Sequence, residues 1–209
     1  MPNTSLPKLH ASPPADLSFS KVSQVRAFVL ERDAGNLLVY AAATMPADAV
    51  GDVAAQYINH WHELAAGGAD SVHAPLVINE ADRAAAEDTL PIDRTFSERA
   101  TIDGDFELIP TPGHTPGATA FLWDSGEHRF LFTGDSLYLR DGRWIVAVLE
   151  DSDREAYISS LGLIAELDFD VLVPWAASKD GSYYSLTTPD ETRERIDAIV
   201  ERLERGETS

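Results

Sequence analysis

Short apolar runs separated by polar turns are the main pattern along this chain, and they predict β-strands. Within residues 24–40, the runs VRAFVL and NLLVY flank the polar turn ERDAGN. Gly35 and Asn36 tolerate the positive φ that a tight turn needs, so we expect a β-hairpin there. A strand-like stretch then continues to Met45, and Pro46 ends it because proline cannot donate to a β-ladder.

Further strands are expected where short apolar runs recur. Residues 100–111 predict a second hairpin, with Asp103-Gly104 at its turn. The remaining predicted strands cover residues 73–78, 118–123, 129–132 and 171–173. By contrast, residues 88–99 show no regular period, and we expect them to be irregular.

Three segments are helical by composition or spacing. Residues 80–87 are rich in alanine, and residues 154–167 place apolar side chains at a helical interval. Thr188-Pro189-Asp190-Glu191 forms a capping box with proline at the first helical position, so a helix should run to about residue 205. Its predicted buried stripe consists of Ile196, Ile199, Val200 and Leu203.

Strands and helices alternate without an internal Gly- or Ser-rich linker, which predicts a single α/β domain over residues 19–209. Proline and serine dominate residues 1–18, and we expect a poorly structured arm lying on the domain. This segment lacks the apolar core of a secretory signal, so a cytoplasmic location is expected.

Composition narrows the chemistry and the partners. The chain has no cysteine, so a bound metal must be held by His, Asp or Glu. Its formal net charge is −19, which repels phosphate backbones and argues against a nucleic-acid partner. No apolar run approaches the roughly 18–20 residues that span a bilayer, so no membrane partner is expected. A small-molecule substrate or ligand is therefore the expected partner.

Three segments contain side chains that bind metals: NHWHELAAGG (59–68), TPGHTPG (111–117) and FTGDS (132–136). His60 and His62 project from one side of an extended segment and can chelate one ion. Two prolines and two glycines fix the backbone at His114, and Asp135 follows an apolar strand. Taken singly, each has an ordinary explanation: solvated loop histidines, a histidine in a turn, and an aspartate that caps the next element.

Together, in this order and spacing, the three segments resemble those of the metallo-β-lactamase-fold metallohydrolases. The resemblance covers roughly residues 25–176 and includes Gly67-Gly68 after the histidine motif and the strand LDFDVLVP (167–174). It implies a four-layer αββα sandwich of the α/β class, with the site at one edge between two mixed sheets.

The resemblance assigns the ligands of one metal to residues that are present. The first two histidines of the family's HxHxDH motif align with His60 and His62. His114 matches the third histidine of the first site, and Asp135 matches the carboxylate that usually bridges two metals. These four residues are the predicted metal ligands.

The ligands of the second metal are missing. The Asp and His of HxHxDH are replaced by Leu64 and Ala65, and the last histidine falls at Ala176. Trp175 stands where the family has a glycine beside that last ligand. Because all three losses belong to one ion, the sequence predicts a mononuclear site and excludes two-metal hydrolysis.

We therefore expect a mononuclear metal-dependent hydrolase, with one zinc ion that generates a nucleophile from water. The base is expected to be Asp135 or Glu63, because the family's usual aspartate is missing. Trp61, Trp175 and Lys179 are weaker candidates for substrate contacts.

Two alternatives stay open. His60, His114 and Asp135 form the two-histidine, one-carboxylate set of non-haem iron oxygenases, and the persulfide dioxygenases of this fold resemble that pattern. A catalytically inactive pseudoenzyme that binds a small ligand, without any metal, is the other alternative.

Overall fold

The structure is a computed structural model that describes residues 6–18, 20–44 and 52–207. Its first sheet has the strand order β1-β4-β5-β6-β7-β8. These strands are β1 (Leu9–Ala11), β4 (Phe28–Leu30), β5 (Asn36–Val39), β6 (Val53–Tyr57), β7 (Leu76–Asn79) and β8 (Arg94–Phe96). The predicted first hairpin is confirmed, since β4 pairs with β5 antiparallel.

The second sheet has the strand order β17-β15-β12-β11-β10-β9. Its strands are β9 (Ala100–Ile102), β10 (Phe106–Pro110), β11 (Thr119–Asp124), β12 (Arg129–Phe132), β15 (Val171–Val173) and β17 (Ser185–Leu186). The hairpin predicted around Asp103-Gly104 is confirmed as β9–β10, and both turn residues have positive φ.

A smaller third sheet has the order β14-β13-β16-β3-β2. Its strands are β2 (Ala15–Asp16), β3 (Ser23–Val25), β13 (Tyr138–Arg140), β14 (Arg143–Ile145) and β16 (Ala176–Ser178). The β13–β14 hairpin has Asp141 and Gly142 at its turn, both with positive φ.

Both faces of the second sheet are buried, because its strands carry apolar side chains at successive positions. Phe121 and Phe132 belong to the large core shared with the first sheet. The alternate residues Leu122 and Leu131 belong to a second core, shared with the two long helices. This continuous apolar pattern is what a sheet covered on both sides requires.

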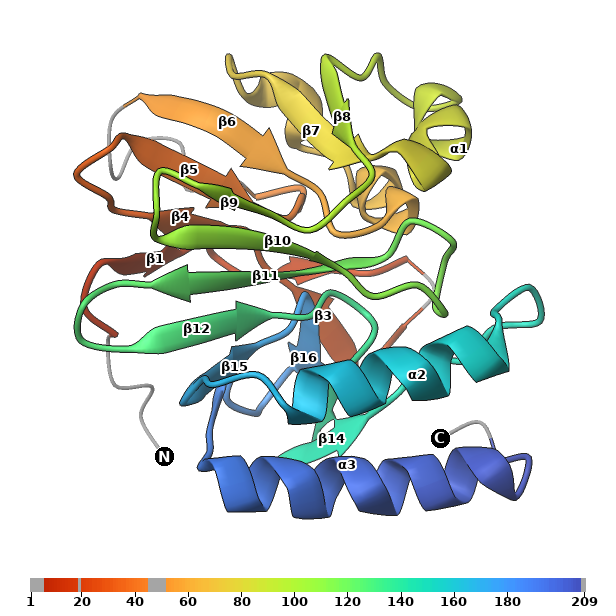
Figure 1. Cartoon of the computed structure of the whole chain (residues 1–209). Helices are drawn as coiled ribbons and strands as arrows, with labels where there is room; N and C mark the ends of the chain where they lie inside the picture. Colours follow the sequence, from red (N-terminus) through yellow and green to blue (C-terminus); the bar gives the residue numbers. More distant parts are fainter. Residues whose placement is uncertain (1–5, 19, 45–51, 208–209) are drawn as a thin grey trace.

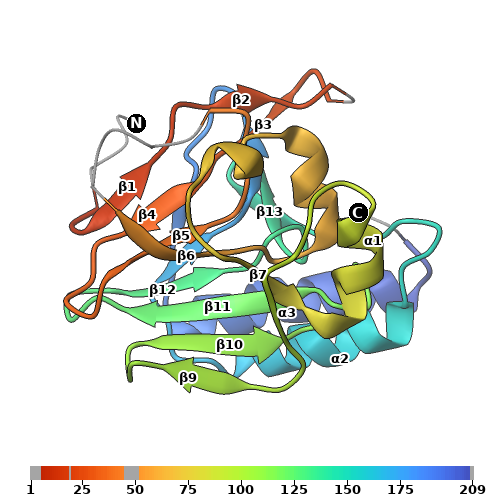
Figure 2. The same cartoon turned by 90° about the horizontal axis from the view of Figure 1, so that it is seen from above.

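The helices cover the sheets from outside (Figures 1 and 2). α2 (Arg154–Ala165) and α3 (Pro189–Glu204) lie side by side against the second sheet. The predicted capping box at Thr188 is present at the start of α3. On the other side, the 3₁₀ helices η1 (Trp61–Ala66), η2 (Ala69–Ser71) and η3 (Glu80–Asp82), with α1 (Arg83–Glu87), lie near β7.

Three expectations are wrong. Residues 88–99 are not wholly irregular, because β8 pairs parallel with β7 at the edge of the first sheet. The described part of the N-terminal arm is not poorly structured: β1 pairs with β4 and β2 pairs with β3. The local sequence does not indicate these pairings, because each of the strands β1, β2 and β8 is only two or three residues long. The strand-like stretch expected after the first hairpin is also absent from the described residues, because β5 ends at Val39 and residues 40–44 are irregular. Met45 and Pro46 lie outside the described residues.

The direction of the strands determines where the chemical side chains meet. β12 and β15 are parallel, and β10 runs the same way because both β10 and β12 pair antiparallel with β11. The segments that follow β10, β12 and β15 therefore leave the second sheet at the same edge. They carry His114, Asp135 and Trp175, respectively.

Among the residues that the structure describes, no helix is both long and apolar enough to cross a membrane.

Candidate metal centre

His60 and His62 lie where β6 gives way to η1. His60 has an extended backbone and is the N-cap of η1, whereas His62 lies within its first turn. The two side chains therefore meet through the start of a helix, and the strand alternation assumed from the sequence does not apply.

A buried carboxylate holds this junction in shape. Glu63 Oε1 accepts a hydrogen bond from the Asn59 backbone N–H at 3.0 Å, and its Oε2 accepts one from Ala41 N–H at 3.1 Å. Oε1 also lies 3.2 Å from His60 Nδ1. Burial raises the pKa of Glu63 well above its usual value. The suggested role of Glu63 as catalytic base does not suit this position, because its carboxyl group faces the ring nitrogen of His60 that points away from Asp135.

His114 lies on the tight loop between β10 and β11. Gly113 has a φ of +143° and presses against α2, where a Cβ would come within 2.4 Å of Tyr157 Cα. The ring of His114 is then oriented by a hydrogen bond of 2.7 Å from Nδ1–H to the Ala147 carbonyl oxygen. Because Nδ1 carries the proton, the lone pair of Nε2 is left to bind a cation.

Asp135 follows β12 after Gly134, whose φ of +56° turns the chain. The Gly134 N–H donates to the Tyr40 hydroxyl at 2.8 Å. Asp135 Oδ2 lies 3.7 Å from His60 Nε2 and 3.9 Å from His114 Nε2. The structure thus brings all four predicted ligand residues together.

The three imidazoles form a compact donor set. One nitrogen from each of His60, His62 and His114 lies within 4.8 Å of the others. His62 Nδ1 is 3.1 Å from His114 Nε2. Among the described residues, His60 Nε2 and Asp135 Oδ1 are buried without a hydrogen-bond partner. Buried polar atoms normally have partners, so these two atoms and the convergent nitrogens fit a metal ion.

The electrostatic environment suits neutral histidine ligands. Burial is the main cause that lowers the pKa of His60, His62 and His114 below the usual value. Burial also raises the pKa of Asp135 to about 7. The imidazoles therefore present free lone pairs at neutral pH, as metal binding requires.

A second buried carboxylate, which the sequence did not single out, joins the two ligand loops. Asp82 Oδ2 accepts hydrogen bonds from the Trp61 backbone N–H at 3.2 Å and from the Thr115 hydroxyl at 2.7 Å. Its Oδ1 accepts one from Gly117 N–H at 2.7 Å. Asp82 thereby fixes the loop of His62 relative to the loop of His114.

The positions of the missing second-metal ligands carry no metal-binding groups. Leu64 is buried in the apolar cluster beneath η1, whereas Ala65 and Ala176 line the cavity beside the site. Trp175 is 3 % exposed, and its indole N–H donates to the Ala41 carbonyl at 2.7 Å. Its ring meets His60 edge-on, with centroids 5.6 Å apart. Apolar side chains, one of them the large indole of Trp175, therefore lie beside the single donor set.

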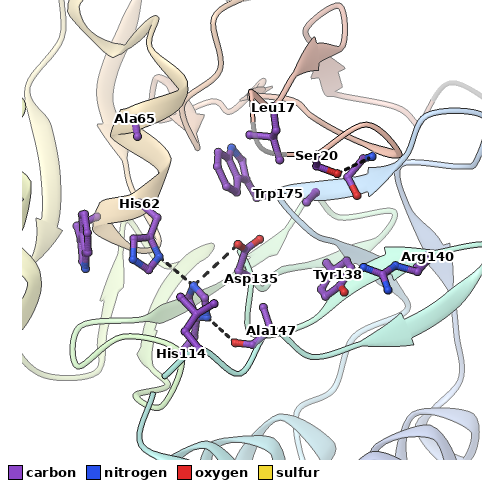
Figure 3. Close-up of a pocket in the computed structure, with 14 residues that line it drawn as sticks. Leu17, Ser20, His62, Ala65, His114, Asp135, Tyr138, Arg140, Ala147 and Trp175 are labelled. Atoms are coloured by element: carbon purple, nitrogen blue, oxygen red, sulfur yellow. Dashed lines mark hydrogen bonds and ion pairs between the residues drawn. The ribbon is translucent and has the colours of Figure 1, made fainter. Parts of the chain in front are cut away.

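The donor set opens into a cavity of about 610 Å³ (Figure 3). Its wall includes Trp61, Trp175 and, opposite His62, the side chains of Tyr138 and Arg140. Lys179, expected as a weak substrate contact, lies outside this wall and pairs with Asp16 at 2.8 Å. Arg140 ends a strand that the sequence pattern does not predict, although the Asp141-Gly142 turn after it is a turn signal.

Comparison with known proteins agrees with this geometry. The sequence model of the metallo-beta-lactamase superfamily matches residues 22–176. No curated protein sequence matches the chain. The chain therefore belongs to the metallo-beta-lactamase superfamily, and the αββα fold predicted from the sequence is confirmed.

Solved structures share this fold at low sequence identity. A metallo-beta-lactamase from Pontibacter korlensis is 16% identical, with a TM-score of 0.69 over 96% of this chain and 97% of that one. An archaeal superfamily protein from Sulfolobus tokodaii is 19% identical, with a TM-score of 0.64 over 93% of this chain and 86% of that one. A family protein from Thermus thermophilus is 18% identical, with a TM-score of 0.63 over 96% of this chain and 80% of that one.

Proposed function

We propose that this protein is a mononuclear metal-dependent hydrolase acting on a small molecule. In this proposal His60, His62 and His114 hold one zinc ion, and Asp135 is the fourth ligand or the base beside it. The observation that carries the proposal is the convergence of three imidazole nitrogens within 4.8 Å, next to the unpartnered atoms His60 Nε2 and Asp135 Oδ1.

The residues around the donor set have separate tasks. The Ala147 carbonyl fixes the ring of His114, and Asn59 Oδ1, 3.1 Å from His60 Nδ1, fixes the ring of His60. A bound ion would supply Lewis acidity and lower the pKa of a coordinated water to about 7. Burial raises the pKa of Asp135 to about 7, so its carboxyl group can hold a proton at neutral pH.

The apolar cavity beside the donor set supports a small-molecule substrate. Trp61 packs closely on His62, with ring centroids 4.0 Å apart, and borders the cavity together with Trp175. These two indoles are therefore proposed to contact the substrate. We also propose a cytoplasmic location, as expected from the N-terminal sequence.

Metal analysis of the purified protein tests this function. We expect about one zinc per chain, loss of that metal in His114→Ala, and retention in His73→Ala, whose histidine is exposed and lies outside the donor set. Slow turnover of model esters should follow the metal content. Iron accompanied by oxygen uptake would support the oxygenase instead. A chain that binds no metal after reconstitution would leave only the ligand-binding pseudoenzyme.

A further inference from the structure

The hydroxyl of Tyr157 joins two segments of the candidate metal centre from behind the cavity wall. It shares one proton between the backbone carbonyls of Asp135, at 3.0 Å, and Ser136, at 2.9 Å. The same hydroxyl accepts a hydrogen bond of 3.3 Å from Ala147 N–H. Tyr157 is 1 % exposed, and it is not among the described residues that line the cavity. It therefore acts on the site only through other residues.

The position of the Asp135 carboxylate depends on the backbone that carries it. Among the described residues, this carboxylate accepts no hydrogen bond: Oδ1 has no partner, and Oδ2 lies 3.7 Å and 3.9 Å from ring nitrogens of two candidate histidine ligands. The preceding peptide is held where Gly134 N–H donates to the Tyr40 hydroxyl. The Asp135 carbonyl, on the other side of the residue, is held by Tyr157.

The second contact of the Tyr157 hydroxyl reaches the ring of His114 through one residue. Ala147 donates its N–H to Tyr157, and its carbonyl accepts the bond of 2.7 Å from His114 Nδ1–H, which Figure 3 shows. Ala147 follows the end of β14 at Ile145, so strand pairing does not hold its backbone. Tyr157 therefore supports the group that keeps the proton on Nδ1 of His114 and leaves Nε2 free.

The start of α2, which carries Tyr157, is itself fixed to the loop of His114. The N-cap residue Asp153 donates its N–H to the Gly113 carbonyl at 2.9 Å, and the Ser152 hydroxyl donates to the His114 carbonyl at 3.0 Å. Tyr157 N–H in turn donates to the Asp153 carbonyl at 2.9 Å. The helix end therefore cannot shift relative to this loop without breaking these bonds.

We propose that Tyr157 is a positioning residue of the metal centre, whose hydroxyl places the Asp135 carboxylate and the His114 ring relative to each other. The effect on a bound metal rests on the proposed function. The orientation of the His114 ring does not, and it can be measured without metal. Tyr157→Phe removes the hydroxyl, keeps the ring that packs in the core, and leaves Ala147 N–H without its acceptor.

Nuclear magnetic resonance of the metal-free protein tests the effect on His114. We expect the Nδ1–H proton of His114 to exchange with solvent about ten-fold faster in Tyr157→Phe than in the unaltered protein, the effect of one weakened hydrogen bond. Nδ1 of His60 lies against Asn59 and Glu63 instead, so its proton should keep its exchange rate. A general loosening of the fold would change both histidines.

Metal binding tests the effect on Asp135. We expect zinc affinity, measured in competition with a chromophoric chelator, to fall about 10- to 100-fold in Tyr157→Phe. The visible spectrum of bound cobalt(II), which reports the geometry of its ligands, should change as well. Thr192→Val is the matched control, because it removes a buried hydroxyl of α3 that lies 3.0 Å from the Thr187 hydroxyl. It should leave the zinc affinity and the cobalt spectrum unchanged.

Two results would overturn the proposal: an unchanged exchange rate of His114 in natively folded Tyr157→Phe, or equal changes in Thr192→Val, which would trace them to lost stability. If Tyr157→Phe does not fold, exchange of the Ala147 amide proton in the unaltered protein decides. Slow exchange supports the contact with the Tyr157 hydroxyl, and rapid exchange refutes it.

Metal content measured on the same samples separates failure of the proposal from failure of the proposed function. A chain that binds no metal, but in which the His114 signal depends on Tyr157, refutes the hydrolase alone. A chain that binds metal, but in which neither the His114 signal nor the metal affinity depends on Tyr157, refutes the positioning role alone.

Discussion

Gly117 lies directly against the carboxylate of Asp82. Its N–H donates to Asp82 Oδ1 at 2.7 Å, and a Cβ placed on Gly117 would stand 2.6 Å from Asp82 Cγ. The same carboxylate accepts hydrogen bonds from Trp61 and Thr115, which flank His62 and His114. A side chain far from the metal ligands in sequence thus keeps their two loops at a fixed separation.

Replacing Asp82 by asparagine should weaken metal binding. Asparagine has one acceptor oxygen and presents an N–H₂ group to donors, so at least one of the three hydrogen bonds is lost. We expect metal affinity to fall by about 10- to 100-fold, as for other residues that orient ligands, while the fold persists. Competition with a chromophoric chelator measures this change.

Asp88→Asn is the matched control for this variant, because Asp88 is exposed at the end of α1. It should bind metal as the unaltered protein does. Unchanged affinity in Asp82→Asn, with a native circular dichroism spectrum, would show that the loops keep their places without Asp82.

Adding one methyl group at Gly117 should destabilise the protein. Backbone and carboxylate atoms of Asp82 leave no room for it, so we expect Gly117→Ala to lower the free energy of unfolding by about 1–3 kcal/mol. Gly162→Ala makes the same change within α2, where nothing lies within 4 Å of the added Cβ. In that variant the free energy of unfolding should rise by about 0.5–1 kcal/mol, because alanine favours the helix. Urea denaturation compares the two, and a loss of equal size in both would contradict the packing argument.

Stability should fall in alkaline solution because of buried tyrosines. Burial raises the pKa of Tyr40 and Tyr157 well above the ordinary 10.0. The folded protein therefore keeps these protons when the unfolded chain releases them. The stabilisation that these two tyrosines give to the folded protein is complete below about pH 10. It is lost as the pH rises further, by about 1.4 kcal/mol per pH unit for each tyrosine.

Tyr40→Phe separates the contribution of one hydroxyl. The Tyr40 hydroxyl donates to the Val173 carbonyl and accepts from Gly134 N–H, both at 2.8 Å. Removal of this hydroxyl should lower the free energy of unfolding by about 1–3 kcal/mol at neutral pH, because both partners lose a buried hydrogen bond. Tyr40→Phe should also remove the contribution of one tyrosine, about 1.4 kcal/mol per pH unit, from the loss of stability above about pH 10. Urea unfolding at about pH 7 to 11 measures both effects, and an unaltered pH dependence would exclude Tyr40 as a source.

Local sequence signals were sufficient where an element is long or its turn is distinctive. The capping box at Thr188 and the Asp103-Gly104 turn are two such signals, and the structure confirms both. The equivalent turn at Asp141-Gly142 and the strand that ends at Arg140 are not among the elements that the apolar pattern predicts. β8 gave no local signal, since its pairing with β7 depends on backbone contacts across the sheet.

By itself the sequence determined which donors are available: three histidines and an aspartate on short loops, without cysteine and without ligands for a second ion. These features follow from residue type and spacing, which sequence records directly. Only the tertiary structure decided that the Glu63 carboxylate lies against Nδ1 of His60 and that Asp82 joins the two ligand loops. It also decided that Arg140 lines the cavity and that Lys179 does not. Such relationships depend on strand direction and packing between segments distant in sequence, because side-chain neighbours are fixed only once the two sheets have come together.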